Sequence, residues 1–159
     1  MTNKNKITNR WLPVVLCLMF FAAPLFANTA AIEIETLLQT NAVTYGQAAR
    51  FILEAADIAA ITDTEEAFNY LSEKNWVSEK NTADQIARLD VISGIFMKAF
   101  DIKGGLFYSL TEHSHYAYRE LVYKNVIQGM TEPSMKVSGE LLLFMTNRIL
   151  STNQTGAAQ

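Results

Sequence analysis

The sequence predicts an all-α fold in which three pseudo-repeated helical hairpins, about six helices, form a compact bundle. A pattern of Leu, three residues, Asn and two apolar residues occurs three times, ending at Val43, Val77 and Ile127. Asn tolerates the left-handed backbone conformation that ends a helix, so each copy is typical of a helix end followed by a return to the core. Apolar residues recur with helical spacing between the copies, and strand patterns are nearly absent.

The first segment, residues 1–27, has the features of a cleaved signal peptide. Lys4, Lys6 and Arg10 precede an apolar stretch that ends at Ala27, a small residue suited to cleavage. The stretch is short and contains two prolines, which disfavours a membrane span, although an uncleaved anchor stays open as the alternative. We therefore expect an exported protein of the bacterial periplasm or cell envelope, with no transmembrane segment in the mature chain.

Cleavage would leave one domain, residues 28–150, and a small polar tail, residues 151–159, that is expected to be disordered. The mature 132 residues (159 − 27) contain 10 basic residues (13 − 3) and 16 acidic ones, a net charge of −6. This charge argues against nucleic acid as a partner. The single cysteine lies in the signal segment, which excludes disulfides and thiolate metal sites from the mature chain.

Each predicted hairpin pairs a helix that ends near the repeated Asn with the helix that follows it. Helices of the first kind are expected at residues 31–40, 64–75 and 114–125. Helices of the second kind are expected at residues 44–57, 83–100 and 137–150. The second kind carries the wider apolar stripes, so we expect these helices to form the centre of the bundle.

Capping patterns support these boundaries. Pairs with capping-box or near-capping-box spacing are Thr44 with Gln47, Asp63 with Glu66, and Thr82 with Gln85. Ser138 is the expected N-cap of the last helix. The segment 103–110 contains two glycines and is expected to be a turn rather than a strand.

The junctions between these helices resemble those of the S-layer homology (SLH) domain. The likeness covers most of residues 35–150 in permuted register. Its best segments are residues 67–77 and 117–129, together with the helix starts at residues 43–47, 86–90 and 137–140. SLH domains typically bind cell-wall polysaccharide in grooves between their repeats, and a signature Thr-Arg-Ala-Glu segment begins the first helix of each repeat.

The resemblance implies binding of a cell-wall glycan in which an Arg meets acidic sugar groups. Arg88, followed by Asp90, keeps the basic–acidic pair of the signature, while Ala87 replaces its Thr. Tyr45 replaces the signature Arg in the first copy. Tyr rings also stack on sugar faces.

A later predicted helix carries Tyr118, Arg119 and Tyr123, which would suit an acidic glycan or a peptide. Arg119 can hold a carboxylate through two parallel hydrogen bonds. The alternative is that Tyr118 packs in the core, like Phe68 in the preceding hairpin, and that Arg119 pairs with a nearby acid.

Glu112, His113 and His115 form the most suggestive cluster for a metal ion. A structural site needs about four ligands, and no second cluster of His or Cys is present in the sequence. The interpretation we favour is a polar helix start capped by Ser114. We expect no metal and no cofactor.

No nucleophile with its base, phosphate loop or placed carboxylate pair can be recognised, so we do not expect an enzyme. The predicted function is non-catalytic binding of a cell-wall-associated glycan, with Arg88, Asp90, Tyr45 and Arg119 as candidate ligand-binding residues. The alternative is a periplasmic interaction or adaptor module that keeps the scaffold without glycan binding and accepts a partner protein.

Overall fold

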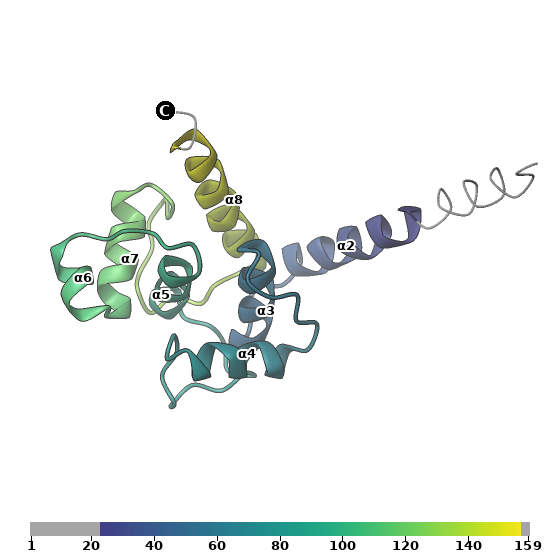
Figure 1. Ribbon diagram of the computed structural model, residues 1–159, viewed down its shortest axis with the longest axis horizontal. Helices are drawn as coiled ribbons and strands as arrows, with labels where there is room; N and C mark the ends of the chain where they lie inside the picture. The colour runs from purple at the N-terminus through teal and green to yellow at the C-terminus, as the bar shows by residue number, and fades with distance from the viewer. Residues whose placement is uncertain (1–22, 157–159) are drawn as a thin grey trace, which may run out of the picture. The chain divides into compact units, whose positions relative to one another are not determined.

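The computed structural model describes residues 23–156, and the side chains of residues 31–152 among them. The described residues form seven helices and no strand, which confirms the predicted all-α class (Figure 1). The helices are α2 (Ala23–Leu38), α3 (Tyr45–Ala55), α4 (Thr64–Glu73), α5 (Leu89–Ala99), α6 (Leu106–Thr111), α7 (Ser114–Tyr123) and α8 (Gly139–Gly156).

The described part of the chain divides into two units, residues 23–36 and residues 37–156. The second unit contains α3 to α8 and all the sites discussed below. Most of the predicted signal peptide, residues 1–22, lies outside the described residues. A search of the described helices for one with the length and apolar character to cross a membrane found none.

The predicted caps of α3, α4 and α8 are present. The Thr44 hydroxyl accepts from the Gln47 N–H at 3.3 Å, and the Gln47 side chain accepts from the Thr44 N–H at 3.0 Å. Asp63 Oδ1 accepts from the N–H groups of the first turn of α4. Ser138 Oγ accepts from the Leu141 N–H at 3.1 Å. Side chains thus satisfy backbone donors that a helix start leaves without partners.

The predicted start of α5 is wrong. The helix begins at Leu89, six residues later than the expected 83–100. The Thr82–Gln85 pair therefore caps no helix. The Gln85 carbonyl instead accepts from the Tyr45 N–H at 2.9 Å, because this segment pairs with a distant part of the chain.

Two of the three repeated asparagines adopt the left-handed conformation that was predicted. Asn75 has φ 56° and Asn125 has φ 57°, two residues beyond the ends of α4 and α7. Asn41 is not among the positive-φ residues, so the prediction is wrong there. The end of α2 is closed differently, since the Thr40 N–H donates to the Leu37 carbonyl at 3.0 Å.

Further boundaries also differ from the expectations. Helix α2 begins at Ala23, eight residues before the start of the expected helix 31–40. Residues 106–111 of the predicted turn form α6. The last helix continues to Gly156, so residues 151–156 of the predicted tail are helical. His113, rather than Ser114, is the N-cap of α7, because its Nδ1 accepts from the His115 N–H at 3.2 Å.

A closed ring of three backbone hydrogen bonds joins the segments that precede α3, α5 and α8. The Val43 N–H donates to the Val137 carbonyl at 2.8 Å, and the Ala87 N–H donates to the Val43 carbonyl at 2.9 Å. The Val137 N–H completes the ring at the Ala87 carbonyl, at 3.1 Å. All three residues are fully buried. The ring therefore fixes where the three helices begin.

Most of the largest fully buried side chains come from these same three helices. They are Tyr45, Ile52 and Leu53 of α3, Leu89, Ile92, Ile95, Phe96 and Met97 of α5, and Leu142 and Met145 of α8. Helices α4 and α7 contribute mainly Leu71 and Leu121. The apolar stripes of α3, α5 and α8 thus supply the core around the ring.

Candidate functional site

The ring brings three of the four candidate residues together. Arg88 is the N-cap residue of α5, and Asp90 lies in the first turn of the same helix. Tyr45 is the first residue of α3. The Arg88 N–H donates to the Tyr45 hydroxyl at 3.3 Å, although the two residues are 43 apart in the sequence.

Arg88 and Asp90 form a two-pronged ion pair. Arg88 Nε donates to Asp90 Oδ1 at 3.2 Å, and Arg88 Nη2 donates to Oδ2 at 2.9 Å. The Asp90 side chain is only 10% exposed, whereas that of Arg88 is 50% exposed. An Arg has five N–H donors, so three remain for a ligand that approaches from solvent.

The Asp90 carboxylate is held in place from its other side as well. Its Oδ1 accepts from the Val91 N–H at 2.9 Å, at the start of α5, where the helix dipole favours a negative charge. Asp90 is therefore a positioning residue that fixes one edge of the Arg88 guanidinium.

Tyr45 occupies the core. It is fully buried, and its ring centre lies 6.5 Å from that of Phe68. Burial raises the pKa of the Tyr45 hydroxyl, and this outweighs the hydrogen bond from the Arg88 N–H, which lowers it. Its ring is not accessible for stacking on a sugar. Its contact with the candidate site is the hydrogen bond that its hydroxyl accepts from the Arg88 N–H.

Arg119 belongs to a different part of the molecule. It is an exposed residue of α7, and no hydrogen bond or ion pair joins it to another described residue of the site. Its neighbour Tyr118 is half-buried and donates to the Thr131 carbonyl at 2.8 Å. The structure thus separates Arg119 from Arg88 and Asp90.

The sequence analysis missed Lys136. Arg88 and Lys136 face each other in an antiparallel bridge. The bridge is flanked by hydrogen bonds from Leu89 N–H to the Met135 carbonyl, at 2.9 Å, and from Val137 N–H to the Ala87 carbonyl. This is the non-hydrogen-bonded kind of pair, in which opposite side chains come closest.

Lys136 is exposed, and no described residue forms an ion pair with its ammonium group. Two basic residues therefore stand directly opposite each other across the bridge, and of the two only Arg88 has an acidic partner among the described residues. The sequence offered one signal that could have identified Lys136, namely its place directly before the expected helix 137–150. The pairing across 48 positions (136 − 88) comes from the fold.

The bridges also correct the register in which Arg88 was compared with the other helix starts. Val43, Ala87 and Val137 are equivalent in the ring, so Arg88 corresponds to the N-caps Thr44 and Ser138. The resemblance to the SLH signature instead pairs Arg88 with Tyr45, one position after the N-cap Thr44. Arg88 therefore occupies the N-cap position of α5, but its side chain forms no cap hydrogen bond with the helix.

The histidine cluster has a structural explanation. His113 Nδ1 is engaged by the His115 N–H, and both rings meet Tyr116 edge to face at 6.4 Å and 5.8 Å. Within the described part of the chain, no three His, Cys, Asp or Glu side chains are placed to hold a metal ion.

The site can bind an anionic group through charge-assisted hydrogen bonds from Arg88 and Lys136. Its described residues include no paired nucleophile and base. No protein-family model, curated protein or solved structure matches the chain.

Proposed function

We propose that this chain is a non-catalytic cell-envelope protein that binds an acidic cell-wall-associated glycan through an SLH-like helical module. The pairing of Arg88 with Lys136 across one backbone bridge carries the proposal. Like charges directly opposite each other destabilise a bridge, so an anion bound between them would relieve that repulsion.

The chain is acidic overall, so the Arg88–Lys136 pair is a local concentration of positive charge. The whole sequence has a formal net charge of −3. An acidic protein attracts an acidic polymer only where cations are concentrated locally. Asp90 neutralises part of the Arg88 charge but also fixes the orientation of the guanidinium, whose planar fork of donors matches carboxylate and phosphate groups.

Recurrent hydrogen bonds support an SLH-like organisation. The Lys98 amine donates to the Asn75 carbonyl at 3.2 Å, and Arg148 Nη2 donates to the Asn125 carbonyl at 3.1 Å. Both partners of the second bond lie 50 positions after those of the first. Together with the threefold ring, this pattern favours three related helical hairpins as the scaffold.

Co-sedimentation with purified bacterial walls tests the proposal. We expect the purified chain to pellet with intact walls and to stay in the supernatant with walls whose acidic secondary polymers have been chemically stripped. Pelleting should weaken as salt concentration rises, because the contacts are charge-assisted and solvent-exposed. Equal pelleting with both wall samples would refute recognition of the acidic glycan.

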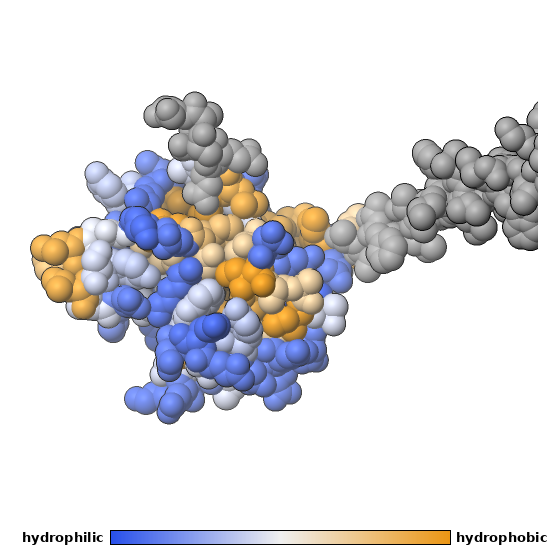
Figure 2. Space-filling view, viewed as in Figure 1, coloured by the Kyte–Doolittle hydropathy of each residue, from blue (hydrophilic) through white to orange (hydrophobic). Residues whose placement is uncertain are grey.

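A protein-interaction module is the second candidate, and one surface favours it. Leu106, Phe107 and Leu110 of α6 are 72%, 67% and 74% exposed. Figure 2 shows the apolar area that they form at the left of the view, over α6. Neighbouring apolar side chains left open to solvent are typical of partner-binding surfaces.

The second candidate predicts a different outcome. The chain would then remain in the supernatant with both wall samples. Chemical cross-linking in intact cells would give adducts with an envelope protein, and Leu110→Ser would remove them while Lys136→Gln would not.

A further inference from the structure

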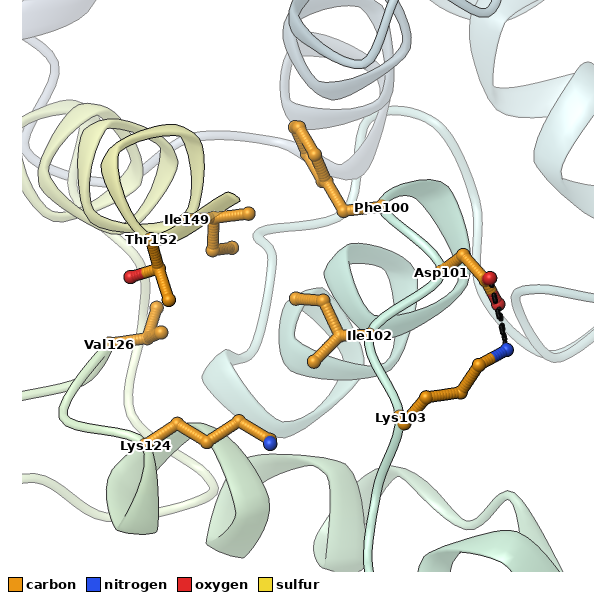
Figure 3. A pocket seen from close by; sticks show the side chains of 8 residues that line it. All are labelled: Phe100, Asp101, Ile102, Lys103, Lys124, Val126, Ile149 and Thr152. Atoms are coloured by element: carbon orange, nitrogen blue, oxygen red, sulfur yellow. Dashed lines mark hydrogen bonds and ion pairs between the residues drawn. The ribbon is translucent and has the colours of Figure 1, made fainter. Parts of the chain in front are cut away.

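We propose that a groove at the C-terminal end of α5 binds an aliphatic carboxylate, a ligand with one anionic head and an apolar chain. The groove has a volume of about 380 Å³, within the range of small-molecule sites. Its walls come from the ends of α5 and α7 and from α8 (Figure 3). The lining residues are Phe100, Asp101, Ile102, Lys103, Lys124, Val126, Ile149 and Thr152.

The inner surface of the groove is mainly apolar. Val126 and Ile149 are 4% and 2% exposed, and the half-buried Phe100 and Ile102 pack against the same core. In Figure 3 the four side chains surround the open space from different sides. Such a surface favours an alkyl chain over a sugar, whose hydroxyls would lose hydrogen bonds to water there.

One cation at the rim lacks an acidic partner. The Lys103 amine is held by the Asp101 carboxylate at 2.8 Å and 3.0 Å, so their charges cancel. The Lys124 side chain extends along the lower edge of the groove in Figure 3. No described residue forms an ion pair with Lys124. A single positive charge beside an apolar surface is complementary to an amphipathic monoanion.

Comparison with the preceding hairpin shows why the space is open. Lys124 and Val126 lie 50 positions after Lys74 and Trp76. The backbone turns are equivalent, since the Trp76 N–H donates to the Leu71 carbonyl at 2.8 Å and the Val126 N–H to the corresponding Leu121 carbonyl at 2.9 Å. The large indole at position 76 packs against the core, whereas valine at position 126 fills much less volume.

This groove is separate from the proposed glycan site. Arg88 marks the N-terminal end of α5, and Phe100 marks its C-terminal end. A helix of 11 residues is about 16 Å long, so the two sites lie at opposite ends of one rigid element. The inference therefore does not depend on glycan binding.

Titration calorimetry of the whole chain with decanoate, below its micelle concentration, tests the inference, with decanol as the uncharged counterpart. We expect saturable binding of decanoate and weaker binding of decanol. Lys124→Gln should weaken decanoate binding about fivefold and leave decanol binding unchanged, because it removes one exposed charge contact. Lys74→Gln, the equivalent change outside the groove, should have no effect.

Two variants that fill the groove complete the test. Val126→Trp should abolish binding, since it places at position 126 the side chain that occupies position 76. Thr152→Trp should also abolish it and alters an exposed position, so it decides the matter if Val126→Trp does not fold. Undiminished decanoate binding by a folded filling variant, equal effects of the two lysine changes, or no saturable binding by the wild type would overturn the proposal.

Discussion

Tyr45 is the residue through which the core and the candidate site meet. Its ring is buried among core side chains, and its hydroxyl accepts the backbone N–H of Arg88. Burial raises the pKa of Tyr45 above the usual 10.0, and burial together with Glu112 raises that of Tyr108. The folded chain therefore holds these phenolic protons to a higher pH than the unfolded chain does.

The sign of the resulting pH dependence follows from proton linkage. Stabilisation from the neutral tyrosines is complete below about pH 10 and is lost as the pH rises through their folded-state pKa values. We predict that Tyr45→Phe reduces the decrease in the free energy of unfolding at alkaline pH. The same change should lower the free energy of unfolding at neutral pH by about 1 kcal/mol, because the Arg88 N–H loses its acceptor.

Urea unfolding between about pH 8 and pH 11 measures this effect. Tyr123→Phe, at a position 83% exposed, should keep the wild-type slope of the free energy of unfolding against pH. If Tyr45→Phe also kept that slope, the buried hydroxyl would not be the source of the alkaline sensitivity.

At the scale of the element, helix ends show what a local pattern can and cannot predict. Asn75 and Asn125 take the left-handed conformation because an apolar residue must return to the core directly after each helix. Asp57 and Asp101 do the same at the ends of α3 and α5, with φ 55° and 47°, but Asp is a weaker signal and went unrecognised.

These conformations make a prediction for three matched substitutions. Replacing Asn75 or Asn125 with Ala should lower the free energy of unfolding by about 1 kcal/mol, because Ala lacks the short polar side chain whose local hydrogen bonds make the left-handed conformation tolerable for Asn. Asn41→Ala should change it by less than about 0.5 kcal/mol, since Asn41 has no positive φ. Thermal or urea unfolding of the three variants measures the difference, and equal losses in all three would contradict this explanation.

At the scale of the whole molecule, hydrophobic periodicity predicted the helical class and six of the seven described helices, although several ends were wrong. It did not predict α6, since a six-residue helix has little periodicity. It also placed the start of α5 at a capping pattern, whereas the observed start depends on pairing with residues 43–45 and 133–137. Such long-range pairing has no signature in a local window of sequence.

The candidate site depends on the same long-range pairing. Arg88 and Asp90 were identified as neighbours on one helix start, and their ion pair is present. Tyr45 was expected at the ligand but lies in the core, and Lys136 became visible only through its bridge to Arg88. The ring that joins three distant segments thus creates a pair of cations that no single segment contains.

The central claim is that these two cations bind acidic wall glycan, and a charge-matched comparison tests it most directly. Arg88→Gln with Lys136→Gln and Lys74→Gln with Lys124→Gln remove two positive charges each, so both double variants have the same net charge. We predict that the first reduces affinity for intact walls at least about tenfold in the pelleting assay, while the second keeps wild-type affinity. Equal affinities of the two double variants would contradict the account.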